Sequence, residues 1–268
     1  MLRIIADYIC KLMHDPLFLG YSLLLFFFID KKKWNRVVAI FFLGCTTNVI
    51  LKCVFKIPLP ENVVHNWYAF PSGHMQFQTI YLGALALELS KGWSLIASFL
   101  LISGWSMWFM GYHILFDLAG GFIVGACILA LHQLLCKKTS EKNQIYFGFV
   151  FGCIALLLLL LSIRTRNYHW GPIGGLFGLG FGMLLSENFI IVPHKTSLLL
   201  KLFVGTIGVG VMKFLTDYFC NNPHSEIYWF TIYFLSILWI SYGVEAISYL
   251  MTSKIRLNNR MLLLFKRS

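Results

Sequence analysis

Charge is the scarcest feature of this 268-residue chain. Only 12% of its residues are charged, whereas 58% are hydrophobic and 17% are aromatic. A soluble domain carries about 25% charged residues, so the composition excludes an ordinary soluble protein. A helix needs roughly 20 apolar residues to cross the hydrocarbon core, and we therefore expect an all-α integral membrane protein, a polytopic bundle of about nine transmembrane helices. The nine apolar runs begin near Leu17, Val37, His74, Trp93, His113, Phe147, Ile173, Ser197 and Ile227.

Acidic residues are also few, with 11 Asp and Glu against 22 Lys and Arg, which gives a net charge of +11. No nucleic-acid-binding motif accompanies this charge. The basic residues lie instead in short loops at 30–36 and 137–142 and in the C-terminal tail. The positive-inside rule places these segments on the cytoplasmic face, where we expect the tail to contact anionic lipid.

The chain divides by composition into five segments. An amphipathic stretch at 1–16, which we expect in the membrane interface, precedes a first helix bundle at 17–136. A cytoplasmic linker at 137–146 leads to additional transmembrane helices at 147–251, and residues 252–268 form the basic cytoplasmic tail.

Cysteine motifs are absent: the seven cysteines are scattered, without a CxxC pair or a metal-ligand spacing. We interpret them as small buried hydrophobic residues and predict no disulfide framework and no metal site. The glycine-rich stretch 171–182 lacks the Lys-Ser/Thr that follows a nucleotide-binding loop, and its GxxxG pairs predict close helix packing. Four ionisable residues in or near the spans could pair with one another: Glu187, Lys201, Lys213 and Glu245.

One polar stretch, Pro71-Ser72-Gly73-His74, interrupts the apolar sequence. These residues suit a lipid-facing helix poorly, but they suit the start of a helix that holds an anion. Proline presets the turn, serine can cap the helix, and glycine lets backbone amides approach a negative charge. Such a stretch is by itself often no more than a helix cap. Whether it binds an anion depends on the other polar residues at the same membrane face.

His74 and His113 are 39 residues apart, which equals two membrane crossings, so both should lie at the same extracytoplasmic face. Asp117 follows His113 by four residues, on the same face of a helix. An aspartate there can fix the imidazole tautomer and make His113 a nucleophile, with His74 as general acid. Lys52 and Lys56 end an upstream apolar run at this face, where they either snorkel or face an anion.

These residues resemble the motifs of the type 2 phosphatidate phosphatase superfamily, membrane lipid phosphatases related to the vanadium haloperoxidases. The family motifs K-x6-R-P, P-S-G-H and S-R-x5-H-x3-D correspond to 52–60, 71–74 and 106–117, and the likeness covers roughly residues 15–135. It makes 17–136 a catalytic bundle without a metal or other cofactor. It implies that His113 forms a phosphohistidine, that Asp117 orients it and that His74 protonates the leaving group. It also implies that Lys52, Ser72 and the Gly73 amide hold phosphate oxygens.

Both family arginines are missing, since Leu59 and Met107 stand in their places. Arginine binds phosphate bidentately, and losing one preorganised donor can cost about 10²–10³ in rate. Three alternatives remain open. Other cations, Lys56, Arg164 and Arg166, could compensate in a phosphatase. The substrate could be a less charged diester, as in the sphingomyelin synthases that this pattern also resembles, or the protein could be a catalytically silent lipid-binding protein.

The resemblance implies hydrolysis of a lipid-linked phosphate monoester or diphosphate at the extracytoplasmic face. The expected partners are a phospholipid or polyprenyl-phosphate substrate and the lipid bilayer, with no nucleic acid. The longer form resembles bacterial members of the family, so we expect the bacterial inner (cytoplasmic) membrane.

Overall fold

The computed structural model describes residues 1–11, 25, 28–60, 68–138, 157, 170–188, 197–219 and 226–251. Within these ranges the regular secondary structure is helical, and one isolated bridge joins Pro58 and Tyr68, which confirms the all-α prediction. The helices are α1 (Leu2–Lys11), α3 (Lys31–Phe55), α4 (Gly73–Leu89), α5 (Trp93–Phe109), α6 (Leu115–Lys138), α8 (Trp170–Asn188), α9 (Leu198–Phe219) and α10 (Glu226–Leu238), which continues through a π-helical turn (Trp239–Gly243) to Met251.

Four described helices are long and apolar enough to cross a membrane: Lys31–Phe55, Leu115–Leu134, Leu198–Phe219 and Ile227–Met251. Trp93–Phe109 and Trp170–Ser186 are apolar but shorter, and α4 has only 17 residues. The count of nine spans is therefore not confirmed. The expected runs near Leu17 and Phe147 lie, for the most part, outside the described residues.

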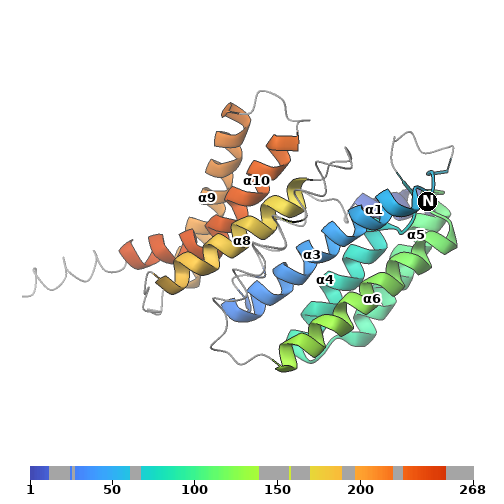
Figure 1. The fold of residues 1–268 in the computed structure, drawn as a ribbon, viewed down its shortest axis with the longest axis horizontal. Coiled ribbons are helices and arrows are strands. Elements are labelled where there is room, and N and C mark those ends of the chain that lie inside the picture. The colour runs from blue at the N-terminus through green and yellow to red at the C-terminus, as the bar shows by residue number, and fades with distance from the viewer. Residues whose placement is uncertain are drawn as a thin grey trace, which may run out of the picture.

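The helices form two adjoining groups (Figure 1). Helices α3, α4, α5 and α6 lie side by side, with α1 packed on α5 at one end, and α8, α9 and α10 form the second group. Helix α4 contacts α3, α5 and α6, while α3 also packs against α8 and so joins the two groups. The main core draws on both of them, with Phe42 of α3, Ile80 of α4, Leu176 of α8 and Ile237 of α10 all fully buried.

Glycines set the closest helix approaches. A Cβ on Gly174 or Gly178 of α8 would overlap the carbonyls of Phe230 and Phe234 on α10, which confirms that this GxxxG pair is a packing surface. On α6, a Cβ on Gly121 would meet the Ser72 carbonyl at the start of α4. Small residues thus bring the start of α4 directly against α6.

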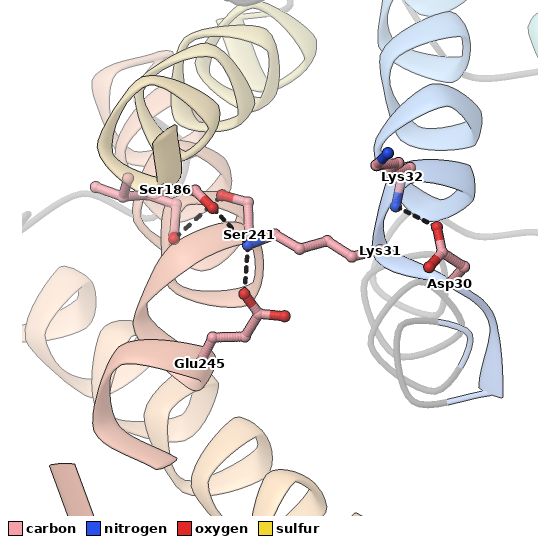
Figure 2. A network of polar contacts seen from close by, with 7 residues as sticks. Asp30, Lys31, Lys32, Ser186, Ser241 and Glu245 are labelled. Carbon is pink, nitrogen blue, oxygen red and sulfur yellow. Dashed lines mark hydrogen bonds and ion pairs between the residues drawn. The ribbon is translucent and has the colours of Figure 1, made fainter. Parts of the chain in front are cut away.

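The end of α3 that carries residues 31–36 is held by ion pairs. Lys31 Nζ donates to Glu245 Oε2 at 2.5 Å and to Ser186 Oγ at 2.9 Å, as Figure 2 shows. Arg36 makes a two-pronged contact with Glu88, at 2.6 Å for each bond. Lysine 31 thereby links α3 to the second helix group.

The prediction that the intramembrane ionisable residues pair with one another was wrong for Glu245 and Lys213. Glu245 pairs with Lys31, and Lys213 pairs with Asp217 one helical turn away at 2.8 Å. The packing of α3 against the second helix group brings Lys31 within reach of Glu245. The helical repeat brings Asp217 within reach of Lys213.

Candidate functional site

The site is built where α3 ends and α4 and α6 begin. Lys52 lies in the last turn of α3 and is only 4% exposed. Its Nζ donates to the carbonyls of Tyr68 and Ala69, the latter at 3.2 Å. Lys52 therefore points inward and is tied to the segment just before residues 71–74.

The structure does not place the Lys56 side chain beside the buried side chain of Lys52. Lys56 is the C-cap of α3, with a left-handed backbone (φ 52°), and it is exposed. Its backbone N–H still donates to the Lys52 main-chain oxygen at 2.9 Å, but the side chain of Lys56 is exposed whereas that of Lys52 is buried. Leu59, two residues after Ile57, is partly buried.

The stretch 71–74 does start a helix, as the sequence predicts: Ser72 is the N-cap and Gly73 the first residue of α4. The expected serine cap is absent, because Ser72 Oγ makes no capping bond and is fully buried without a hydrogen-bond partner. The Ser72 N–H donates instead to the main-chain oxygen of Asp117 at 3.0 Å. The first bond of the helix runs from Gln76 N–H to Ser72 O, so the amides of residues 73–75 belong to its N-terminal turn.

His113 lies in the turn between α5 and α6 and is 8% exposed. Its Nδ1 is 3.5 Å from Asp117 Oδ2, and Nδ1 has no hydrogen-bond partner. Asp117 Oδ2 accepts instead from the Ile114 N–H at 3.2 Å, while its Oδ1 has no partner. The expected His–Asp hydrogen bond is thus open by a few tenths of an ångström, and such bonds often tighten only when substrate binds.

Electrostatics keep His113 neutral. Burial lowers the pKa of His113 below its ordinary value of 6.5, and the neighbouring charges of Lys52 and His74 lower it further. A neutral imidazole has a free electron pair, which a nucleophile needs. His74, the second residue of α4, is partly exposed and close enough to His113 to act on it electrostatically.

The positions of the two missing arginines carry no charge into the site. Met107 is 3% exposed and packs with Met75, Leu100 and Leu118 in a small apolar cluster. The neighbouring Ser106 hydroxyl donates to the main-chain oxygen one turn earlier in α5. The proposed compensating residues Arg164 and Arg166 lie outside the described residues.

Sequence reasoning missed four residues around the site. Asn48 and Gln76 form a buried hydrogen-bonded pair between α3 and α4. Phe70 stacks on Phe116 with ring centroids 4.8 Å apart, and a Cβ on Gly120 would overlap the Phe70 ring. The available signal was a polar Asn48 within an apolar run, one helical turn before Lys52.

Within the described ranges, no three His, Cys, Asp or Glu side chains gather as a metal-binding group would require. Comparisons with protein-family models, characterised proteins and solved structures found no match. The geometry of His113, Asp117 and the start of α4 is therefore the basis for a functional proposal.

Proposed function

We propose that this protein is a membrane-integral lipid phosphatase that hydrolyses a lipid-linked phosphate monoester or diphosphate through a phosphohistidine. One observation carries the proposal. Three buried polar atoms without hydrogen-bond partners, Ser72 Oγ, His113 Nδ1 and Asp117 Oδ1, belong to residues that meet at the start of α4. Buried polar atoms are normally paired, and an amide-rich helix start is an anion site. A phosphate oxygen can accept from the Ser72 hydroxyl at this site, while His113 Nδ1 and the Asp117 carboxylate are placed to pair with each other.

The chemistry follows from the neutral state of His113. Nδ1 faces Asp117, so Nε2 is the atom that attacks phosphorus, and the bond between phosphorus and the lipid oxygen breaks. Protonated His74 gives its proton to that leaving oxygen. Water then attacks the phosphohistidine, His74 takes the water proton, and the P–N bond breaks to release phosphate and neutral His113. Asp117 stabilises the positive charge that develops on His113.

In this proposal Lys52, Ser72 and the Gly73 amide hold phosphate oxygens. Lys52 already donates to two carbonyls, and an ammonium has three donors, so one remains for substrate. Lys56, Arg164 and Arg166 are further sources of positive charge, of which Lys56 faces outward in the described structure.

A phosphodiester is the second candidate substrate, with head-group transfer or phosphodiesterase activity. The supporting observation is the charge of the site, where buried Lys52 lies close enough to buried Asp117 to interact with it electrostatically and Met107 packs among apolar side chains. A monoanionic diester needs fewer positive partners than a dianionic monoester. A catalytically silent lipid-binding protein is the third candidate.

We further propose about nine transmembrane helices in a bacterial inner membrane, with the site at the extracytoplasmic face. The partners are then a phospholipid or polyprenyl-phosphate substrate and the bilayer.

The test compares phosphate release with head-group transfer. Purified protein in detergent is given a panel of monoester, diphosphate and phosphocholine lipids, with His113→Ala as control. Free phosphate that depends on His113 supports the phosphatase, whereas transfer without free phosphate supports the diester candidate. Absence of His113-dependent turnover on every lipid contradicts both enzymatic candidates and leaves lipid binding.

A further inference from the structure

We propose that Asn48 is a positioning residue that fixes the phosphate-binding turn against the nucleophile. Its catalytic meaning depends on the proposed function, but its structural effect does not. Asn48 lies in α3, one turn before Lys52, and is 2% exposed. Its Nδ2 donates to the Pro71 carbonyl at 3.2 Å and to Gln76 Oε1 at 2.8 Å.

Asn48 and Lys52 together hold one side of the turn. Their i, i+4 spacing places both on the same face of α3, and between them they bind the carbonyls of Tyr68, Ala69 and Pro71. Three of the last four carbonyls before Ser72 are thus drawn toward α3.

The peptide between Pro71 and Ser72 is held from both sides. Its carbonyl accepts from Asn48 of α3, and its N–H donates to the Asp117 main-chain oxygen of α6. A peptide unit is planar, so two bonds on opposite edges fix its orientation. The same aspartate approaches His113 with its side chain, so Asn48 sets the position of the turn relative to the nucleophile.

Gly73 and Gln76 fit this role of Asn48. A Cβ on Gly73 would lie 3.2 Å from Asn48 Oδ1, so glycine gives the asparagine room to approach. Gln76 is fully buried, accepts from Asn48 and donates to the Gly44 carbonyl at 2.9 Å. Asn48 is therefore itself held in place from α4.

The variant Asn48→Leu tests the proposal, because leucine has the same branched shape as asparagine, is larger, and has no donor. Asn35→Leu is the matched control, since Asn35 is a buried asparagine near the other end of α3. On the lipid that gives His113-dependent turnover, we expect Asn48→Leu to lower kcat about 10–100-fold with KM changed less than about threefold, because small displacements at a reacting centre are costly. Asn35→Leu should leave kcat within about twofold.

A second readout needs no turnover. Hydrogen–deuterium exchange of the segment 68–76 in detergent should become at least about tenfold faster in Asn48→Leu and stay unchanged in Asn35→Leu. Asn48→Ser keeps one donor and should lie between wild type and Asn48→Leu, and it replaces the leucine variant if that does not fold. Equal exchange in the asparagine variants overturns the proposal, whatever the lipid assay gives. Accelerated exchange in a protein without turnover instead supports the positioning role and contradicts only the enzymatic function.

Discussion

His113 is the residue whose protonation state decides the proposed chemistry. Its pKa is depressed by burial and then by Lys52 and His74, so the imidazole stays neutral as the pH falls through 6.5. Activity that requires neutral His113 is kept above the folded-state pKa and lost below it. The acidic limb of kcat/KM should therefore lie below pH 6.5.

Removing the Lys52 charge should move that limb. In Lys52→Met one of the causes of the depressed pKa is gone, so the pKa of His113 rises and the acidic limb shifts to higher pH. The variant should also have a lower kcat, because Lys52 binds two carbonyls of the adjoining turn. The measured quantity is therefore the pH at which the acidic limb of kcat/KM falls. Lys56→Met, at an exposed site, is the control and should leave the limb in place. An unmoved limb in Lys52→Met contradicts the electrostatic argument.

Met107→Arg should not restore a family-like phosphatase. The new guanidinium would enter the apolar cluster of Met75, Leu100 and Leu118, and burying an unpaired charge costs several kcal/mol, about 3 or more. Thermal unfolding in detergent should show this loss, while Met107→Leu should cost less than about 1.5 kcal/mol. A stable Met107→Arg protein with increased monoester hydrolysis would show that this position faces the substrate.

At the scale of residues, the sequence motifs predict which residues lie near one another better than they predict the hydrogen bonds that these residues make. The spacing of His113 and Asp117 placed them within 3.5 Å, and the Pro-Ser-Gly-His stretch does start a helix. The sequence could not predict that Ser72 Oγ makes no cap, or that the Ser72 N–H donates to the main-chain oxygen of Asp117 in another helix. Asn48 went unnoticed because its partner Pro71 lies 23 residues away.

Among the secondary-structure elements, the contact of Lys31 with Glu245 is a charged link between the two helix groups. Both side chains are about one quarter exposed, at 21% and 26%. Lys31→Met leaves the carboxylate without its lysine and should lower the free energy of unfolding by about 1–2 kcal/mol. The double variant Lys31→Met/Glu245→Leu should recover part of this loss, because an apolar pair removes the stranded charge. Additive losses in the double variant would show that the pair is not coupled.

The helices themselves are largely predictable from apolar runs. Expected starts near Trp93, Ile173, Ser197 and Ile227 correspond to α5, α8, α9 and α10, each within three residues. The run near Val37 begins earlier, at Lys31, because Asp30 caps the helix by accepting from the Lys32 N–H. The π-helical turn after Leu238 and the Lys31–Glu245 pair, 214 residues apart, depend on tertiary packing that a local pattern does not contain.

For the molecule as a whole, the orientation in the membrane is a prediction that chemical labelling can check. Lys56 and Lys91 are both exposed. They lie at opposite ends of the α3–α6 group, because Lys56 is near the start of α4, Lys91 follows its end, and the helix is about 25 Å long. In a chain whose seven native cysteines are replaced, Lys56→Cys in intact cells should react with a membrane-impermeant thiol reagent. Lys91→Cys should react only after the cells are opened. The reverse pattern would place the site on the cytoplasmic face.

The overall class follows from composition, whereas the number of spans does not. Scarce charge and long apolar runs suffice to predict an all-helical membrane bundle. The span count depends on helices such as α4, whose buried Gln76, Gln78 and Thr79 lower its hydropathy although the helix packs at the centre of its group. Polar residues that serve helix packing and a functional site look the same in sequence as residues that end a span.

The measurement that most directly tests the central claim is the search for phosphate bound covalently to His113. Protein mixed with the best lipid of the panel is quenched under alkaline conditions, which preserve phosphohistidine, and its peptides are examined by mass spectrometry. We predict phosphate on His113 in the wild-type protein, none in His113→Asn, and less in Asp117→Asn. Turnover without phosphate on His113, or turnover that persists in His113→Asn, would contradict His113 as the nucleophile.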